Sequence, residues 1–122
     1  MKYTIAIAAL VLAACTDGSP TDSVCPTANA PTYSDFGQHF FTTYCTGCHS
    51  ASATNRHGAP RSQNYDTEAD VRMHDDDIDA VAAVGPAASN TFMPELAGSV
   101  SAKPTDAERQ QLGQMLACMH AP

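Results

Sequence analysis

The stretch Cys45-Thr46-Gly47-Cys48-His49 determines what the rest of this chain has to fold around. Its pattern, C-x-x-C-H, is the attachment signature for a c-type haem. Two thiols at this spacing can add to the two vinyl groups of the porphyrin, and the adjacent histidine then lies under the iron as its proximal ligand. Gly47 relieves crowding where the backbone runs beside the ring. The stretch therefore predicts one covalent haem c, attached through Cys45 and Cys48, with His49 as a ligand of the iron.

Two other kinds of site also use a C-x-x-C pair. A thioredoxin-type dithiol needs a surrounding βαβ pattern, which the sequence does not contain. A zinc site needs a second Cys/His pair at ligand spacing, whereas the remaining cysteines are single and distant. A haem-free protein in which Cys45 and Cys48 form a disulfide stays open as an alternative.

The first fourteen residues have the composition of an export signal, with a positive charge at Lys2 followed by a short apolar run. This run is too short for a permanent membrane-spanning helix. Residues 12–15, Leu-Ala-Ala-Cys, resemble the lipobox of bacterial lipoproteins, which implies cleavage before Cys15 and diacylation of its thiol. Two acyl chains anchor a protein stably. We expect residues 1–14 to be a signal peptide and the protein to be exported to the cell envelope or periplasm, anchored to a membrane by lipid. The alternative is an ordinary secretory signal that is cut near Cys15.

Two further cysteines, Cys25 and Cys118, lie near the two ends of the remaining chain. An exported protein folds in a compartment where disulfides form. We therefore predict a bridge that ties the N-terminal segment to the last helix, and the alternative is two free thiols. Closing so long a loop would stabilise the fold by roughly 4 to 5 kcal/mol in the chain-entropy account.

The charge balance is acidic, with 13 Asp and Glu against 6 Lys and Arg and a formal net charge of −7. This balance argues against nucleic acid as a partner. An acidic surface would favour docking on a basic surface of a partner protein, although solubility alone would also explain it.

Composition and periodicity divide the rest of the chain into a tether and one domain. Residues 15–32 are rich in Ser, Thr, Pro, Asp and Ala and are expected to form a flexible tether, with first contact to the domain at Cys25. Residues 33–122 would form the domain. It has no tryptophan, and a haem would supply the large apolar plate that so small a core needs.

Apolar spacing and capping residues predict an all-α fold of about three to five short helices. The first helix should start at Tyr33, with Ser34 or Asp35 as its N-cap, and run into the haem motif. Two short helices should follow at residues 67–74 and 77–84. The clearest start is a capping box at residues 105–108, which opens the terminal helix.

A loop at residues 50–66 should complete the proximal side of the haem. A backbone carbonyl near Pro60 would accept the Nδ1–H of His49 and so fix its tautomer. Arg56 and Arg61 would pair with the haem propionates, since guanidinium matches carboxylate geometry.

A second loop, at residues 87–103, should supply the sixth iron ligand. Met93 is held by Pro94 in an irregular segment, where its thioether can point inward. The alternative is a core methionine that fills a gap. The rivals for a bis-histidine site are His39, His57, His74 and His120.

The order of helix, C-x-x-C-H, loop, short helices, methionine loop and capped terminal helix resembles the small class I c-type cytochromes. The resemblance covers most of residues 33–120 and implies a cytochrome c-like fold in which the first and last helices cross. It also implies Met93 as the distal ligand, and transfer of single electrons between redox partner proteins without catalytic residues. An aromatic residue that the family often carries on the terminal helix is replaced here by Leu and Met.

The alternative is a five-coordinate haem in a sensor or peroxidase-like protein. It would need an open distal position beside a histidine or arginine base. His57 or His74, with Arg56 or Arg72, would be the residues available for that role.

Overall fold

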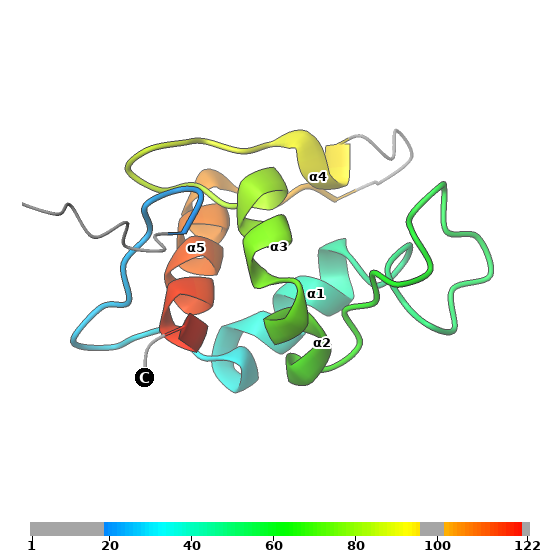
Figure 1. Ribbon diagram of the computed structural model, residues 1–122, viewed down its shortest axis with the longest axis horizontal. Helices are drawn as coiled ribbons and strands as arrows, with labels where there is room; N and C mark the ends of the chain where they lie inside the picture. The colour runs from blue at the N-terminus through cyan, green and yellow to red at the C-terminus, as the bar shows by residue number, and fades with distance from the viewer. Residues whose placement is uncertain (1–18, 96–101, 121–122) are drawn as a thin grey trace, which may run out of the picture.

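The computed structural model describes residues 19–95 and 102–120 (Figure 1). Within these ranges the order of elements is a π-helical turn followed by α-helices: η1 (Tyr33–Gly37), α1 (Gln38–Tyr44), α2 (Glu68–Met73), α3 (Asp75–Ala82), α4 (Phe92–Glu95) and α5 (Asp106–His120). The only β-type pairing in these ranges is an isolated bridge between Val84 and Ser89. The all-α prediction is therefore confirmed for the described part of the chain. The predicted signal peptide and Cys15 lie outside it.

The first helical segment starts at Tyr33, as predicted, but its N-cap lies two or three residues before the predicted Ser34 or Asp35. Thr32 is the N-cap, and its Oγ1 accepts the backbone N–H of Asp35 at 3.1 Å. Because this hydroxyl satisfies a free N–H of the first turn, neither Ser34 nor Asp35 acts as the cap. The segment then runs through η1 and α1 to Cys45, so the haem motif begins where α1 ends.

Both predicted boundaries of the second middle helix shift by two residues. The start of α2 was predicted correctly, and the structure adds that Thr67 caps it in a capping box with Asp70. The next helix, α3, starts at Asp75 instead of 77 and ends at Ala82, before Gly85. Three aspartates occupy its first turn, where the helix dipole favours negative charge.

The predicted capping box at the start of α5 is confirmed. The N–H of Thr105 donates to Glu108 Oε2 at 2.7 Å, and the N–H of Glu108 donates to Thr105 Oγ1 at 3.2 Å. Reciprocal bonds of this kind satisfy donors that a helix start leaves free. None of the described helices is long and apolar enough to cross a membrane.

The core lies between the first helical segment, α3 and α5 (Figure 1). Its largest fully buried apolar side chains are Phe40, Phe41, Val71, Leu112, Met115 and Leu116. A Cβ at Gly37 would lie 2.7 Å from Met115 Sδ, so glycine allows η1 and α5 to approach closely. Tyr44 Oη donates to Glu108 Oε1 at 3.0 Å and ties the end of α1 to the start of α5. The first and last helical segments therefore pack against each other, as the resemblance implied.

Residues 19–26 form a strap that packs along the domain. Thr21 is fully buried, and its N–H and Oγ1 donate to the two carboxylate oxygens of Asp79 at 2.7 and 2.9 Å. The N–H of Ala87 donates to the Thr21 carbonyl at 3.0 Å. The chain therefore contacts the domain at Thr21, earlier than the Cys25 contact expected for a flexible tether.

The structure pairs Cys25 with Cys118, with the two Cα atoms 4.6 Å apart. The predicted bridge is confirmed. It joins the end of the strap to the last turn of α5. Because Thr21 and Cys25 are both fixed, the strap is held at two points.

Candidate functional site

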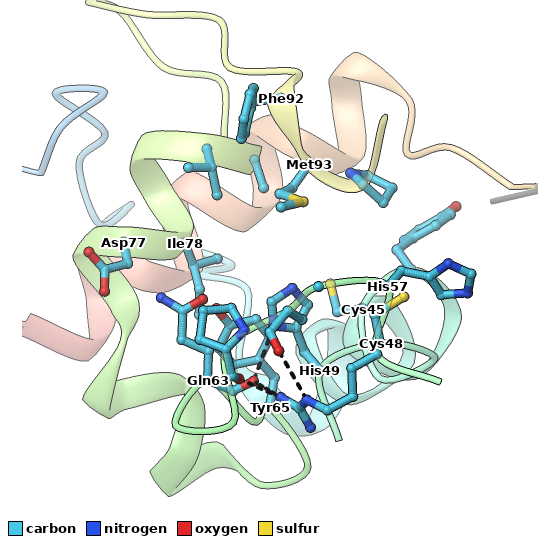
Figure 2. Close-up of a pocket in the computed structure, with 18 of the residues that line it drawn as sticks. Cys45, Cys48, His49, His57, Gln63, Tyr65, Asp77, Ile78, Phe92 and Met93 are labelled. Atoms are coloured by element: carbon cyan, nitrogen blue, oxygen red, sulfur yellow. Dashed lines mark hydrogen bonds between the residues drawn. The ribbon is translucent and has the colours of Figure 1, made fainter. Parts of the chain in front are cut away.

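The Cys45–His49 stretch forms a tight turn directly after α1. The N–H of Cys48 and the N–H of His49 both donate to the carbonyl of Cys45, at 3.0 and 2.8 Å. Cys45 and Cys48 are the free cysteines of the described residues. Figure 2 shows their sulfur atoms and the His49 ring on the same side of one cavity.

The cavity has a volume of about 420 Å³, within the range of ligand pockets in proteins. Its walls come from three parts of the chain, namely the end of α1 with the following loop, α3, and the segment that carries α4. The walls are mostly apolar, and their larger apolar residues are Phe40, Tyr44, Tyr65, Ile78, Val81, Phe92, Met93 and Pro94. Such a space suits a large apolar ligand with a few polar attachment points.

Burial raises the pKa of the Cys45 thiol to about 12, although the Arg109 charge acts in the opposite direction. A thiol with so high a pKa carries little thiolate at neutral pH and is a weak nucleophile in disulfide exchange. This electrostatic environment, in an all-helical surrounding, does not favour a thioredoxin-type dithiol.

His49 is held in one orientation by two neighbours. Its Nδ1–H donates to the Gln63 carbonyl at 3.1 Å, and its ring stacks on Tyr65 with centroids 4.6 Å apart. Burial lowers the pKa of His49, helped by the charges of Arg56 and His74 and opposed by the Gln63 bond. A neutral imidazole with its proton on Nδ1 leaves Nε2 free as a metal ligand.

The carbonyl near Pro60 that was expected to accept from His49 belongs instead to Gln63. The Pro60 carbonyl accepts from Arg56 Nη2 at 2.6 Å, and Pro60 itself lines the cavity. Arg56 Nη2 donates to both the Pro60 and the Gln63 carbonyls, and of the two the Gln63 carbonyl is also bonded to His49.

Arg56 holds the loop between the C-x-x-C-H turn and α2. Its guanidinium donates to one side-chain oxygen, on Asn64, and to the backbone carbonyls of Ser50, Ala59, Pro60 and Gln63. Arg56 lines the cavity, but its donors are largely committed to this loop. Arg61 does not line the cavity and lies instead at a second, more polar hollow formed by residues of the same loop. The structure thus brings only one of the two predicted propionate partners to the cavity.

Met93 lies across the cavity from His49 (Figure 2). It sits in α4 with extended backbone angles, φ −110° and ψ 143°. Of the methionines in the described ranges, Met93 alone lines the cavity. Met73 is 76% exposed and Met115 is in the core. The structure therefore brings together the four side chains that sequence reasoning proposed as thioether and iron ligands.

Among the histidines that could replace Met93, only His57 lines the cavity. Figure 2 shows its imidazole beyond Cys48, directed away from Met93. His74 Nε2 bonds the Ser62 carbonyl at 3.0 Å. His120 Nε2 lies 3.1 Å from Asp75 at the other end of α3. A second histidine opposite His49 is therefore not favoured by the geometry.

Sequence reasoning missed two residues at the site, Tyr65 and Arg109. Tyr65 stacks on His49, and burial raises its pKa to about 12, so its hydroxyl is neutral. Arg109 is 1% exposed and bonds the Met93 carbonyl at 2.8 Å. Arg109 precedes Leu112 by three residues and Leu116 by seven, which places a charge on the apolar face of α5. An arginine at such a position is expected to be buried, so the sequence pattern alone could have identified Arg109.

No protein family matches this chain, and neither the curated proteins nor the solved structures contain a match.

Proposed function

We propose that this protein is a mono-haem c-type cytochrome that carries single electrons between redox partners at the cell envelope. One observation carries the proposal: Cys45, Cys48, His49 and Met93 line a single apolar cavity, with His49 and Met93 on opposite sides (Figure 2). Haem, when bound, supplies the one-electron chemistry.

The residues present fit that group. Two free thiols separated by two intervening residues lie on the same side of the cavity as the imidazole, as thioether attachment beside a proximal histidine requires. The cavity walls are mostly apolar, which suits the faces of a porphyrin.

Three groups of the chain itself would support the haem, namely the backbone carbonyl of Gln63 and the side chains of Tyr65 and Met93. Gln63 accepts the Nδ1–H of His49, which fixes the tautomer and makes Nε2 a better donor. Tyr65 restricts rotation of the imidazole by stacking on it. Met93 offers a neutral thioether, which favours the reduced iron and so raises the reduction potential.

Two further parts of the proposal concern the redox partners and the location of the protein in the cell. The net charge of −7 would orient transient docking on a basic surface of a redox partner. Lipid on Cys15 would confine the protein to a membrane face and raise its effective concentration near membrane-bound partners. No catalytic residue set is part of the proposed function.

The test is the absorption spectrum of the matured protein, oxidised and reduced. We expect one covalent haem and, in the oxidised form, the weak far-red band of a methionine-ligated ferric haem. Met93→Ala should abolish that band. Met73→Ala is the matched control, because Met73 is 76% exposed and does not line the cavity. A protein matured in a haem-attaching host that carries no covalent haem would sink the proposal and favour a Cys45–Cys48 disulfide.

A five-coordinate sensor or peroxidase-like protein is the second candidate, because His57 and Arg56 line the same cavity. The other residues considered for it are engaged elsewhere: His74 bonds Ser62, and Arg72 bonds Met119 and Glu68. Carbon monoxide distinguishes the two candidates. A ferrous spectrum that carbon monoxide leaves unchanged supports the carrier, whereas a large shift supports an open iron.

A further inference from the structure

Arg109 reaches from α5 to the segment that carries Met93. Its Nη1 donates to the carbonyls of Ala82, Asn90 and Met93, at 2.8, 3.1 and 2.8 Å. Ala82 is the last residue of α3, and Asn90 and Met93 lie on the segment that follows it. The side chain is 1% exposed, and its Nη2 has no hydrogen-bond partner among the described residues. Burying a guanidinium is costly, so its bonds to these carbonyls must offset that cost.

We propose that Arg109 is a positioning residue that fixes the Met93 segment over the cavity and keeps the Met93 sulfur opposite His49. The proposal rests on the proposed function in so far as Met93 ligates iron. α4 spans only Phe92–Glu95, and such a short helical turn does not hold itself in place. Phe92 is 56% exposed and so gives the segment little apolar anchoring.

On the His49 side of the cavity, an arginine also holds the chain through backbone carbonyls. Arg56 donates to the Gln63 carbonyl at 3.0 Å, and that carbonyl also accepts from His49. Each segment that carries a proposed iron ligand is thus held by one arginine through backbone carbonyls. Charge-assisted bonds of this type are roughly twice as strong as neutral ones.

The Arg109 charge also reaches the cavity electrostatically, since it lowers the pKa of Cys45 against the larger effect of burial. If the cavity held haem, a buried positive charge near the cavity would favour the reduced state, which carries less positive charge. Arg109 therefore has a second expected effect, a raised reduction potential, that a purely structural residue would not have.

The experiment compares Arg109→Met with Arg109→Lys in the full matured protein. Methionine keeps an unbranched chain but has no donor. Lysine keeps the charge and offers three donors on one nitrogen, which suits a site where three carbonyls converge on one nitrogen, Nη1, whose two hydrogens they share. The control is Arg72→Gln, because Arg72 also donates to a backbone carbonyl, that of Met119, but lies on the surface of α2.

Three readouts are used: the far-red methionine band, the reduction potential, and amide hydrogen exchange at Val84 and Asn90. These amides donate to the carbonyls of Arg109 and Ala83, at 3.1 and 2.9 Å. For Arg109→Met we expect loss of the band, a lower reduction potential and exchange faster by about tenfold or more, the factor for one lost charged bond. Arg109→Lys should keep most of the band, and Arg72→Gln should match the wild type.

An unchanged band together with unchanged exchange in Arg109→Met would overturn the proposal. If that variant does not fold, Arg109→Gln decides by the same readouts, because a shorter neutral side chain removes the buried charge and cannot reach all three carbonyls. A wild type without haem refutes the proposed function, whereas the exchange rates still decide whether Arg109 holds the segment.

Discussion

Replacing Cys25 and Cys118 together with serine should lower the free energy of unfolding substantially. The two cysteines are 93 residues apart in sequence. For a loop of that length the chain-entropy model gives about 4 to 5 kcal/mol. Small domains have total stabilities of about 5 to 15 kcal/mol, so the bridge would account for a large share of this one.

The measured loss should lie at or below that figure, at about 2 to 5 kcal/mol. Residual structure in the unfolded chain reduces the entropy gained. The bonds of Thr21 to Asp79 are present in both proteins and so cancel in the comparison. Urea unfolding of the oxidised wild type and the double variant measures the difference. The slope against urea should also rise, because an uncrosslinked chain exposes more surface. A loss below about 1 kcal/mol with an unchanged slope would refute the entropy argument.

Three further changes probe the framework around the site. Thr105→Ala removes the cap of α5 and should cost about 1 kcal/mol in urea unfolding; a loss of zero would show that the cap is dispensable. Glu108→Gln tests pH dependence: the backbone N–H of Thr105 lowers the pKa of Glu108, so its stabilisation is present above the unfolded-state pKa and is lost as pH falls through the folded one. The variant should therefore lose less stability on acidification, and an equal loss would contradict this. Gly85→Ala should lower the melting temperature, because a Cβ there would lie 2.5 Å from the Thr21 carbonyl oxygen, which is backbone and cannot rotate away; an unchanged melting temperature would refute the close contact.

The helix starts for which the sequence indicated the correct capping residue are those encoded within four residues. Thr67 with Asp70 and Thr105 with Glu108 each form a complete capping box, so the local pattern sufficed. At residues 32–35 several hydroxyl and carboxylate side chains compete for the cap, and Thr32 takes it. The local sequence alone does not indicate which of these side chains becomes the N-cap.

The parts that the sequence did not predict depend on contacts between distant residues. Thr21 and Asp79 are 58 residues apart, and nothing near Thr21 identifies its partner. The choice of Gln63 over Pro60 depends on how the loop folds. Arg109 could have been noticed as a charge on an apolar helix face, but the three carbonyls that it bonds are fixed only by the tertiary fold.

The way in which the cavity is held favours a carrier over a sensor. His49 is fixed by Gln63 and Tyr65, and Met93 belongs to a segment that a buried arginine bonds through backbone carbonyls. Ligands held in this manner would keep their positions in both oxidation states, so little of the protein would have to rearrange when an electron arrives or leaves. A sensor needs the opposite, a distal side that opens when a small ligand binds. The bonds of Arg109 therefore connect the fold to the proposed function: if they loosen, the site should move toward an open iron, and carbon monoxide should begin to bind to Arg109→Met while the wild type resists it.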